Sequence, residues 1–276
     1  MKLARCLKAA SSLMGAAGGD NPEWQTRVLA AHALGVPPAG LYGLSFSPVE
    51  EESFFSLVRR VAGGEPLQHV IGEWDFFGRT FAVTPDALIP RPETELLVEL
   101  ALGLPLPPSP KVLDAGTGSG VIGITLALEL PGATVVGTDI SPAAAGLAAG
   151  NALRLQAANY LPVNCSLGDP LRGEFHLIVA NLPYIPSGDI AGLDPVVRDH
   201  EPRLALDGGE KGFSLILELV RMAPGLLSPG GYIVLETGYD QEEPVKAMFS
   251  GEQWVSVETR RDLAGRHRFV TARRRP

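Results

Sequence analysis

The sequence predicts a doubly wound α/β fold, in which a mostly parallel, seven-stranded sheet follows a small helical domain and a β-hairpin. From residue 111 onward, short apolar runs alternate with helical patterns, which is typical of a sheet covered by helices. Residues 1–72 show helical periodicity only. The last two predicted strands are joined by residues 260–266, and a parallel crossover needs roughly a dozen residues or more, so one antiparallel strand is expected near the C-terminus.

Packing signals, without candidate catalytic residues, fill the first 72 residues. Four apolar residues at helical spacing predict one buried helix face: Trp24, Val28, Ala31 and Leu34. Ser47 is the candidate N-cap of a later helix, Pro48 is its first residue, and Glu50 completes a capping box. The Gly63-Gly64 pair ends that helix. These signals predict a small helical bundle.

The sequence pattern changes from helix-forming to β-forming in residues 73–86. Five β-forming residues surround Gly78-Arg79 and predict a hairpin between two domains: Trp74, Phe76, Phe77, Phe81 and Val83. Two prolines then hold Arg91 rigidly, and Glu93 opens a helix that runs to about residue 102. Arg91 and Glu93 are candidates for supporting an active site, although acidic residues in a first turn are also ordinary complements of the helix dipole.

Strands and helices are predicted in alternation after a proline-rich linker. The predicted strands lie at residues 111–114, 134–139, around 163, 175–180, 231–236, 254–259 and 267–272. The predicted helices lie at residues 121–130, 141–155, 213–227 and 242–249. Ligands of such sheets bind beyond the carboxyl ends of the strands, so those ends are where a site is expected.

A glycine-rich loop connects the first of these strands to its helix. It runs through Asp114, Gly116, Thr117, Gly118, Ser119 and Gly120. Glycines let a backbone approach a ligand closely. Asp139 ends the next strand, 19 residues after Gly120, where a carboxylate can accept hydrogen bonds from both ribose hydroxyls of an adenosine group. The spacing predicts a nucleotide-type cofactor.

Two cofactors fit this loop, because residues 118–123 also match the weak G-x-G-x-x-G dinucleotide pattern. A carboxylate at Asp114 would repel a pyrophosphate and suits the ammonium of a methionine moiety. The loop at Asn181 has no role in hydride transfer. Both features favour S-adenosylmethionine over a nicotinamide dinucleotide, and a glycine-rich turn without a ligand is the plainest alternative.

The segment Asn181-Leu182-Pro183-Tyr184 leaves an apolar run, residues 177–180, that predicts a buried strand. Proline stiffens the loop and removes a backbone donor. Asn181 offers one acceptor and two donors, and Tyr184 offers a flat face with a polar tip. Together they could hold a planar amide or amino group, although Asn-x-Pro also occurs as a simple turn.

Composition bounds the remaining function classes. The chain has 276 residues, is 45% hydrophobic and carries a net charge of −8, which argues against binding a DNA backbone. The basic run Arg273-Arg274-Arg275 is expected to be solvated.

Cys6 and Cys165 form no disulfide framework or zinc spacing, and the five histidines are scattered, so no metal and a reducing cytoplasm are expected. No apolar run reaches the ~20 residues of a membrane helix, and Lys8 interrupts the N-terminal run, which predicts an amphipathic helix instead of a targeting signal.

These residues resemble a known family. The glycine-rich loop, Asp139 and the Asn181–Tyr184 segment are similar to class I S-adenosylmethionine-dependent methyltransferases that act on planar nitrogens. Residues 66–74, 88–95 and 201–209 narrow the resemblance to bacterial release-factor glutamine methyltransferases, the HemK family. It implies methyl transfer to the glutamine of the Gly-Gly-Gln motif in peptide chain release factors. It also implies a substrate-docking domain (1–72), a hairpin linker (73–86) and a catalytic domain (87–276) with the seven-stranded methyltransferase sheet. A monomer without direct nucleic-acid contact is expected.

The resemblance implies a set of site residues. Those expected to bind the cofactor are Asp114, Gly116, Thr117, Gly118, Ser119, Gly120, Asp139, Asp169, Pro170 and Asn181. The Asn181 side-chain oxygen and the Leu182 carbonyl are expected to accept hydrogen bonds from the substrate amide, with Pro183 fixing the loop and Tyr184 packing on the amide plane. The family usually has proline in place of Leu182, but the carbonyl is retained, so function should survive with a slightly less rigid loop. The family often has an aromatic residue after the Asp at 169, which leaves the adenine contact of Pro170 open.

Two rival functions have distinct requirements. A nucleic-acid amino methyltransferase would flip a base into the same pocket and needs a basic face, which the acidic composition does not favour. A non-catalytic binding module would have no use for the combination of the Asp114 loop and Asn181.

Overall fold

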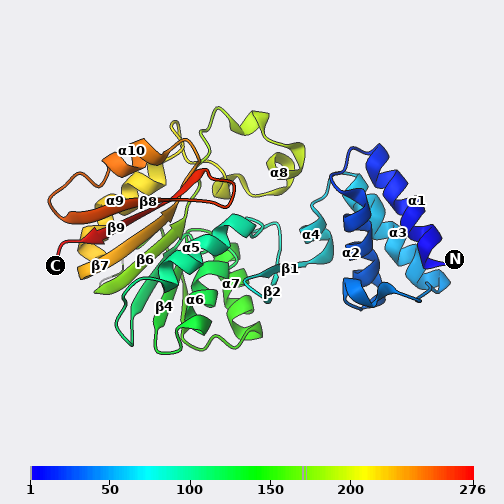
Figure 1. The fold of residues 1–276 in the computed structure, drawn as a ribbon, viewed down its shortest axis with the longest axis horizontal. Coiled ribbons are helices and arrows are strands. Elements are labelled where there is room, and N and C mark those ends of the chain that lie inside the picture. The colour runs from blue at the N-terminus through cyan, green and yellow to red at the C-terminus, as the bar shows by residue number, and fades with distance from the viewer. Residues whose placement is uncertain (1, 170, 172) are drawn as a thin grey trace. The chain divides into compact units, whose positions relative to one another are not determined.

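A computed structural model describes residues 2–169, 171 and 173–276 (Figure 1). These residues form two compact units. The first contains the chain up to residue 73 together with residues 194–200, and the second contains residues 74–193 and 201–276. Residues 195–200 form a short helix, α8 (Pro195–His200).

The first unit is helical, as predicted. Its N-terminal elements are α1 (Leu3–Ala16), α2 (Pro22–Leu34), η1 (Pro38–Leu41), α3 (Pro48–Ala62) and α4 (Leu67–Ile71). The capping box of α3 is confirmed, since Ser47 N donates to Glu50 Oε2 at 2.7 Å and Glu50 N donates to Ser47 Oγ at 3.3 Å. The predicted apolar face of α2 is confirmed at Ala31 but wrong at Trp24, which is 45% exposed, and α2 also buries Leu29 and Ala30. Small residues allow α2 to approach its neighbours closely, whereas the bulky Trp24 does not.

The predicted hairpin is formed by β1 (Glu73–Phe76) and β2 (Arg79–Ala82). Its turn residues are Phe77 and Gly78, with φ values of 50° and 71°. Positive φ at both central residues is the requirement of the type I′ turn, whose twist matches the flanking strands. The turn therefore lies one residue earlier than predicted, and Arg79 already belongs to β2.

The main sheet has seven strands in the order β5-β4-β3-β6-β7-β9-β8. Their bounds are β3 (Lys111–Ala115), β4 (Thr134–Asp139), β5 (Tyr160–Asn164), β6 (Phe175–Asn181), β7 (Leu227–Glu236), β8 (Trp254–Arg261) and β9 (His267–Arg274). The pairs from β5 to β7 are parallel, and β9 pairs antiparallel with both β7 and β8. This confirms the predicted sheet, with β9 inserted between β7 and β8 as its antiparallel strand.

Helices cover both faces of the sheet (Figure 1). The helices are α5 (Pro92–Leu102), α6 (Val121–Glu129), α7 (Pro142–Arg154), α9 (Ser214–Leu226) and α10 (Glu242–Ala247), and the short η2 (Ile190–Gly192) and η3 (Arg203–Ala205) lie in the loops. Val179 and Val234 pack in one core with Leu97 of α5, whereas residues next to them in the strands pack in a second core with α9. Asn181 lies two residues after Val179, and Glu236 lies two residues after Val234. Because side chains alternate along a strand, Asn181 and Glu236 point to the α5 side as well.

Candidate active site

A cavity of about 180 Å³ lies at the carboxyl ends of the parallel strands. One water molecule occupies ~10–15 Å³ on the same measure, so this space suits an organic ligand. Six predicted site residues line it together: Gly116, Gly118, Asp139, Asn181, Leu182 and Pro183. The structure therefore brings the glycine-rich loop and the Asn181 loop to a single cavity, although they are far apart in the sequence.

Asp139 organises the cofactor side of the cavity. Its Oδ2 accepts a hydrogen bond from Gly118 N at 2.9 Å, and its Oδ1 accepts one from Ser141 N at 2.8 Å. A carboxylate has about four acceptor positions, so lone pairs remain for a ligand. Gly116 has φ of 72°, and a Cβ there would lie 2.7 Å from Leu182 Cδ2. A glycine is thus favoured where the loop passes Leu182.

Asp114 lies below the loop and outside the cavity wall. Thr117 Oγ1 donates to its Oδ2, and Gly123 N donates to the same oxygen at 2.9 Å. Burial raises the pKa of Asp114 to about 6, against the lowering effect of these two hydrogen bonds. Within the described residues its Oδ1 has no hydrogen-bond partner. Asp114 supports the loop, and its contact with the cofactor stays a prediction.

The side chain of Asn151, a residue of α7, supports the rest of the glycine-rich loop by a hydrogen bond. Thr117 and Ser119 are 4% and 3% exposed, and Gly120 is the N-cap of α6, so none of them lines the cavity. Asn151 Nδ2 donates to Ser119 O at 2.9 Å and to Ala82 O at 3.0 Å, and its Oδ1 accepts from Ala82 N at 2.8 Å. Its side chain connects the loop to the hairpin. Asn151, a buried amide in an alanine-rich helix, was not among the predicted site residues.

Asn181 is the last residue of β6, and two buried residues lie next to it. Its Nδ2 donates to Thr94 Oγ1 at 3.1 Å, and Thr94 Oγ1 donates to Glu236 Oε2 at 2.8 Å. Burial raises the pKa of Glu236 to about 7; hydrogen bonds from Thr94 and Asn181 and the charge of Arg268 oppose this rise, and the charge of Glu93 adds to it. Thr94 and Glu236 were missed, although Glu236 ends an apolar strand as Asn181 does.

Tyr184 is held beside the cavity without lining it. The guanidinium of Arg268 lies 5.8 Å from the centre of the Tyr184 ring, and Gln241 Nε2 donates to Tyr184 O at 2.8 Å. Burial raises the pKa of the Tyr184 phenol, as does the charge of Glu236. These contacts fix the backbone and the ring of Tyr184. Its packing on a substrate amide stays a prediction.

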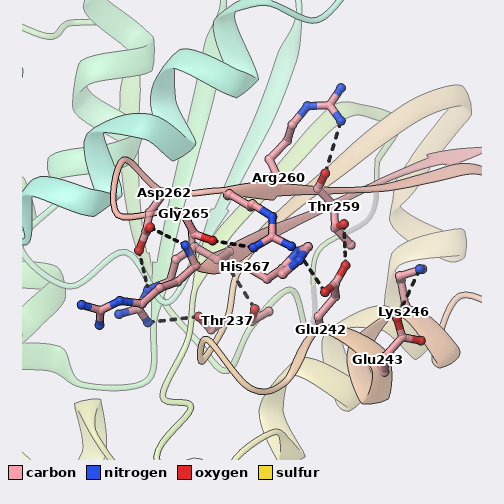
Figure 2. A network of polar contacts seen from close by, with 12 residues as sticks. Thr237, Glu242, Glu243, Lys246, Thr259, Arg260, Asp262, Gly265 and His267 are labelled. Atoms are coloured by element: carbon pink, nitrogen blue, oxygen red, sulfur yellow. Dashed lines mark hydrogen bonds and ion pairs between the residues drawn. The ribbon is translucent and has the colours of Figure 1, made fainter.

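Arg268 contacts a polar network at the β8–β9 end of the sheet. Figure 2 shows Thr237, Asp262 and Glu242 of this network. Arg268 Nη1 donates to Thr237 O at 3.3 Å, and its Nε lies 3.7 Å from Asp262 Oδ2. Further along, Glu242 accepts from Thr259 Oγ1 at 2.6 Å and lies 2.9 Å from His267 Nδ1. The network connects α10 to both C-terminal strands and so supports the Arg268 side chain that contacts Tyr184.

Arg91 supports the cavity wall by an ion pair. Its Nη2 lies 2.5 Å from Glu201 Oε1, and Glu201 Oε2 accepts from Ile89 N at 3.1 Å. Glu201 is 5% exposed. The pair therefore connects the segment after the hairpin, which contributes Leu88 to the wall, to the segment that contributes Pro202. Glu93 is exposed and reaches the site only through its charge.

One residue that was predicted to contact the cofactor does not line the cavity, and its contact with the cofactor stays a prediction. Asp169 is exposed and does not line the cavity, and Pro170 lies outside the described residues. Ser166 and Leu167 line the wall in this region instead. The tight turn that follows β5 points Asp169 to solvent, since Asp169 N donates back to Ser166 O at 2.9 Å.

No group of three or more His, Cys, Asp or Glu side chains in the described residues could hold a metal ion, and the expectation of a metal-free site stays a prediction. In the part of the chain that the structure describes, no helix is long and apolar enough to cross a membrane.

Comparisons with known proteins identify the relatives of the chain. A family model described as PrmC N-terminal domain matches residues 5–72, and one described as Ribosomal protein L11 methyltransferase (PrmA) matches residues 94–184. A methyltransferase from Pyrococcus furiosus has the same fold, with a TM-score of 0.54 and 20% identity, over 72% of this chain and 90% of that one.

Relatives that match nearly the full length of the chain show its family. The release factor glutamine methyltransferase of Geobacter sulfurreducens is 43% identical over 93% of this chain and 91% of its own length. The protein of the same name from Cereibacter sphaeroides is 40% identical over 99% of both chains. The chain belongs to the family of release factor glutamine methyltransferases.

Proposed function

We propose that this protein transfers the methyl group of S-adenosylmethionine to the side-chain amide nitrogen of the glutamine in the Gly-Gly-Gln motif of peptide chain release factors. One observation carries the proposal: Asn181, Leu182 and Pro183 line the same cavity as Gly116, Gly118 and Asp139. A group suited to a planar amide thus lies beside a group suited to a nucleoside. The names of the full-length relatives support this substrate.

The cavity fits S-adenosylmethionine on its own chemistry. Asp139 retains acceptor positions for ribose hydroxyls after its two backbone hydrogen bonds. Gly116 and Gly118 present bare backbone, and Asn181 completes the wall. We propose that these residues hold the cofactor, with Asp114, Thr117, Ser119 and Gly120 shaping the loop. When bound, S-adenosylmethionine supplies an electrophilic methyl group.

The residues of the chain mainly position the substrate. An amide nitrogen is a poor nucleophile because its lone pair is delocalised into the carbonyl. The Asn181 side-chain oxygen and the Leu182 carbonyl each accept one hydrogen bond from the substrate amide, which directs the nitrogen into the cavity and favours positive charge on it. Alignment of two reactants can supply ~7–11 kcal/mol. Pro183 fixes the loop, and the amide proton leaves to solvent after transfer.

Labelled S-adenosylmethionine tests the proposed function. The expected result is label on a purified release factor and none on a factor whose motif glutamine is replaced by alanine. Label on both factors would place the reaction at another residue. Absence of label from both, with cofactor binding intact, would contradict the proposed substrate and leave the nucleic-acid rival to be tested.

We further propose that the helical unit contacts the body of the release factor and that the protein acts as a monomer in the cytoplasm. The helical unit contains none of the cavity residues, which supports a docking role. Cys6 and Cys165 are free thiols, which suits a reducing compartment. A peptide that carries only the motif should show a far higher KM than the intact factor, and light scattering should give the mass of one chain. Equal KM values would exclude the docking role.

A further inference from the structure

The nitrogen of the Asn181 carboxamide is directed into the protein. In the parallel register of β6 and β7, Asn181 lies opposite Glu236, and the first turn of α5 supplies Thr94 on the same face. Asn181 Nδ2 donates to Thr94 Oγ1 at 3.1 Å, and the Asn181 side chain also opposes the rise in the pKa of Glu236. The hydrogen bond to Thr94 places the nitrogen of the carboxamide on the inner side.

The Thr94 hydroxyl makes this arrangement directional. Its single hydrogen goes to Glu236 Oε2 at 2.8 Å, so its lone pairs face Asn181. Above its pKa of about 7, Glu236 is ionised, and an ionised carboxylate only accepts hydrogen bonds. If the Asn181 carboxamide rotated by half a turn, its oxygen would meet the lone pairs of Thr94 and the carboxylate of Glu236. Both partners are 2% exposed, so water could not relieve that repulsion.

The same geometry determines which atom of the Asn181 side chain faces the cavity. Asn181 lines the cavity, whereas Thr94 and Glu236 do not. With its nitrogen held inside, Asn181 presents its side-chain oxygen, an acceptor, to the cavity. An acceptor is the group that the proposed mechanism needs, because the substrate amide nitrogen can only donate.

We propose that Thr94 and Glu236 are positioning residues, which orient the Asn181 carboxamide so that its oxygen faces the substrate amide. The inference rests on the proposed function and adds two residues that act through Asn181. They touch neither cofactor nor substrate. Their effect is therefore expected on kcat and not on the affinity for S-adenosylmethionine.

A matched pair of variants tests the hydroxyl. Thr94→Val keeps the shape of the side chain and removes the hydroxyl, whereas Thr94→Ser keeps the hydroxyl. Methylation of a release factor is followed at saturating S-adenosylmethionine, and the Kd for S-adenosylmethionine is measured by calorimetry. Thr94→Val is expected to lower kcat by about 10- to 100-fold, since small misplacements at a reacting centre have effects of this size. Both the kcat of Thr94→Ser and the Kd of either variant should stay within about threefold of wild type.

A double-mutant cycle separates orientation from general packing. In an Asn181→Ala background, Thr94→Val should lower kcat no further, because the carboxamide that it orients is gone. Wild-type kcat in Thr94→Val, equal losses in Thr94→Val and Thr94→Ser, or a further loss in the Asn181→Ala background would each overturn the inference. In all of these cases the wild-type enzyme labels the release factor. A wild-type enzyme that transfers no label would overturn the proposed function first, and the inference with it.

Discussion

Replacing Glu236 with Gln should make the protein more stable at high pH. Glu236 is 2% exposed, and burial raises its pKa from 4.5 to about 7. The folded chain therefore holds this proton more tightly than the unfolded chain does. The stability that this group contributes is fully present below pH 4.5 and is lost as the pH rises through about 7. A glutamine side chain is neutral at every pH, so the variant lacks this loss.

The size of the effect follows from the two pKa values of Glu236. Each unit of difference corresponds to about 1.4 kcal/mol. Ionisation of Glu236 then costs the folded state about 3 kcal/mol near pH 8 and about 1 kcal/mol near pH 5.5. The difference in the free energy of unfolding between Glu236→Gln and wild type should thus change by about 2 kcal/mol between these conditions, in favour of the variant at the higher pH.

Urea denaturation of both proteins at both pH values measures this change. Other titrating groups, among them Asp114 with a pKa of about 6, are the same in both proteins and cancel in the comparison. The hydrogen bonds that glutamine makes or loses also cancel to first order, because they contribute at both pH values. An unfolding difference that is the same at the two pH values would refute a raised pKa at Glu236.

Three further substitutions test the site and its support. Asn181→Ala should lower kcat by about 100-fold or more while the Kd for S-adenosylmethionine changes little, and comparable turnover in a methylation assay would remove Asn181 from the mechanism. Asp139→Asn should weaken S-adenosylmethionine binding by ~10- to 100-fold, because the amide nitrogen of the new side chain would face one of the two backbone donors, Gly118 N or Ser141 N. Calorimetry measures this affinity, and an unchanged affinity would contradict the role of Asp139. Asn151→Leu should lower the free energy of unfolding by roughly 3 kcal/mol, because it leaves buried backbone groups of Ala82 and Ser119 unpaired. A loss below about 1 kcal/mol in urea denaturation would show that water replaces these hydrogen bonds.

Most of the fold follows from local patterns in the sequence. The strand at 134–139 and the capping box at Ser47 were predicted to the residue, because an apolar run and a cap are each read from adjacent positions. The turn at Phe77-Gly78 was misplaced by one residue, since a positive φ at a phenylalanine has no local signal. The buried face of α2 was also missed, because it depends on which neighbours the helix meets.

Some residues of the candidate site could be predicted from the sequence, and others could not. Asn181 and Asp139 could be predicted because each ends an apolar strand beside a cavity that the fold always forms there. Thr94 could not, because its role requires α5 to bring its first turn over the end of β6. Asp114 was predicted as a ligand contact from its place at a strand end, yet the structure buries it under the loop. Strand-end position indicates which residues lie near the site, and only the register of the sheet shows which of them face it.

Glu236 illustrates why a buried acid can persist at such a position. A neutral or apolar side chain of similar volume would avoid the cost of a buried carboxylate, and such replacements are often stabilising. It would also remove an acceptor for the hydrogen of Thr94, so that the Asn181 carboxamide could turn and present donors to a substrate that can only donate. Stability and orientation therefore make opposite demands on this residue. If the inference is right, Glu236→Gln should unfold at higher urea concentration near pH 8 and yet turn over more slowly, whereas a purely structural role would lower both quantities together.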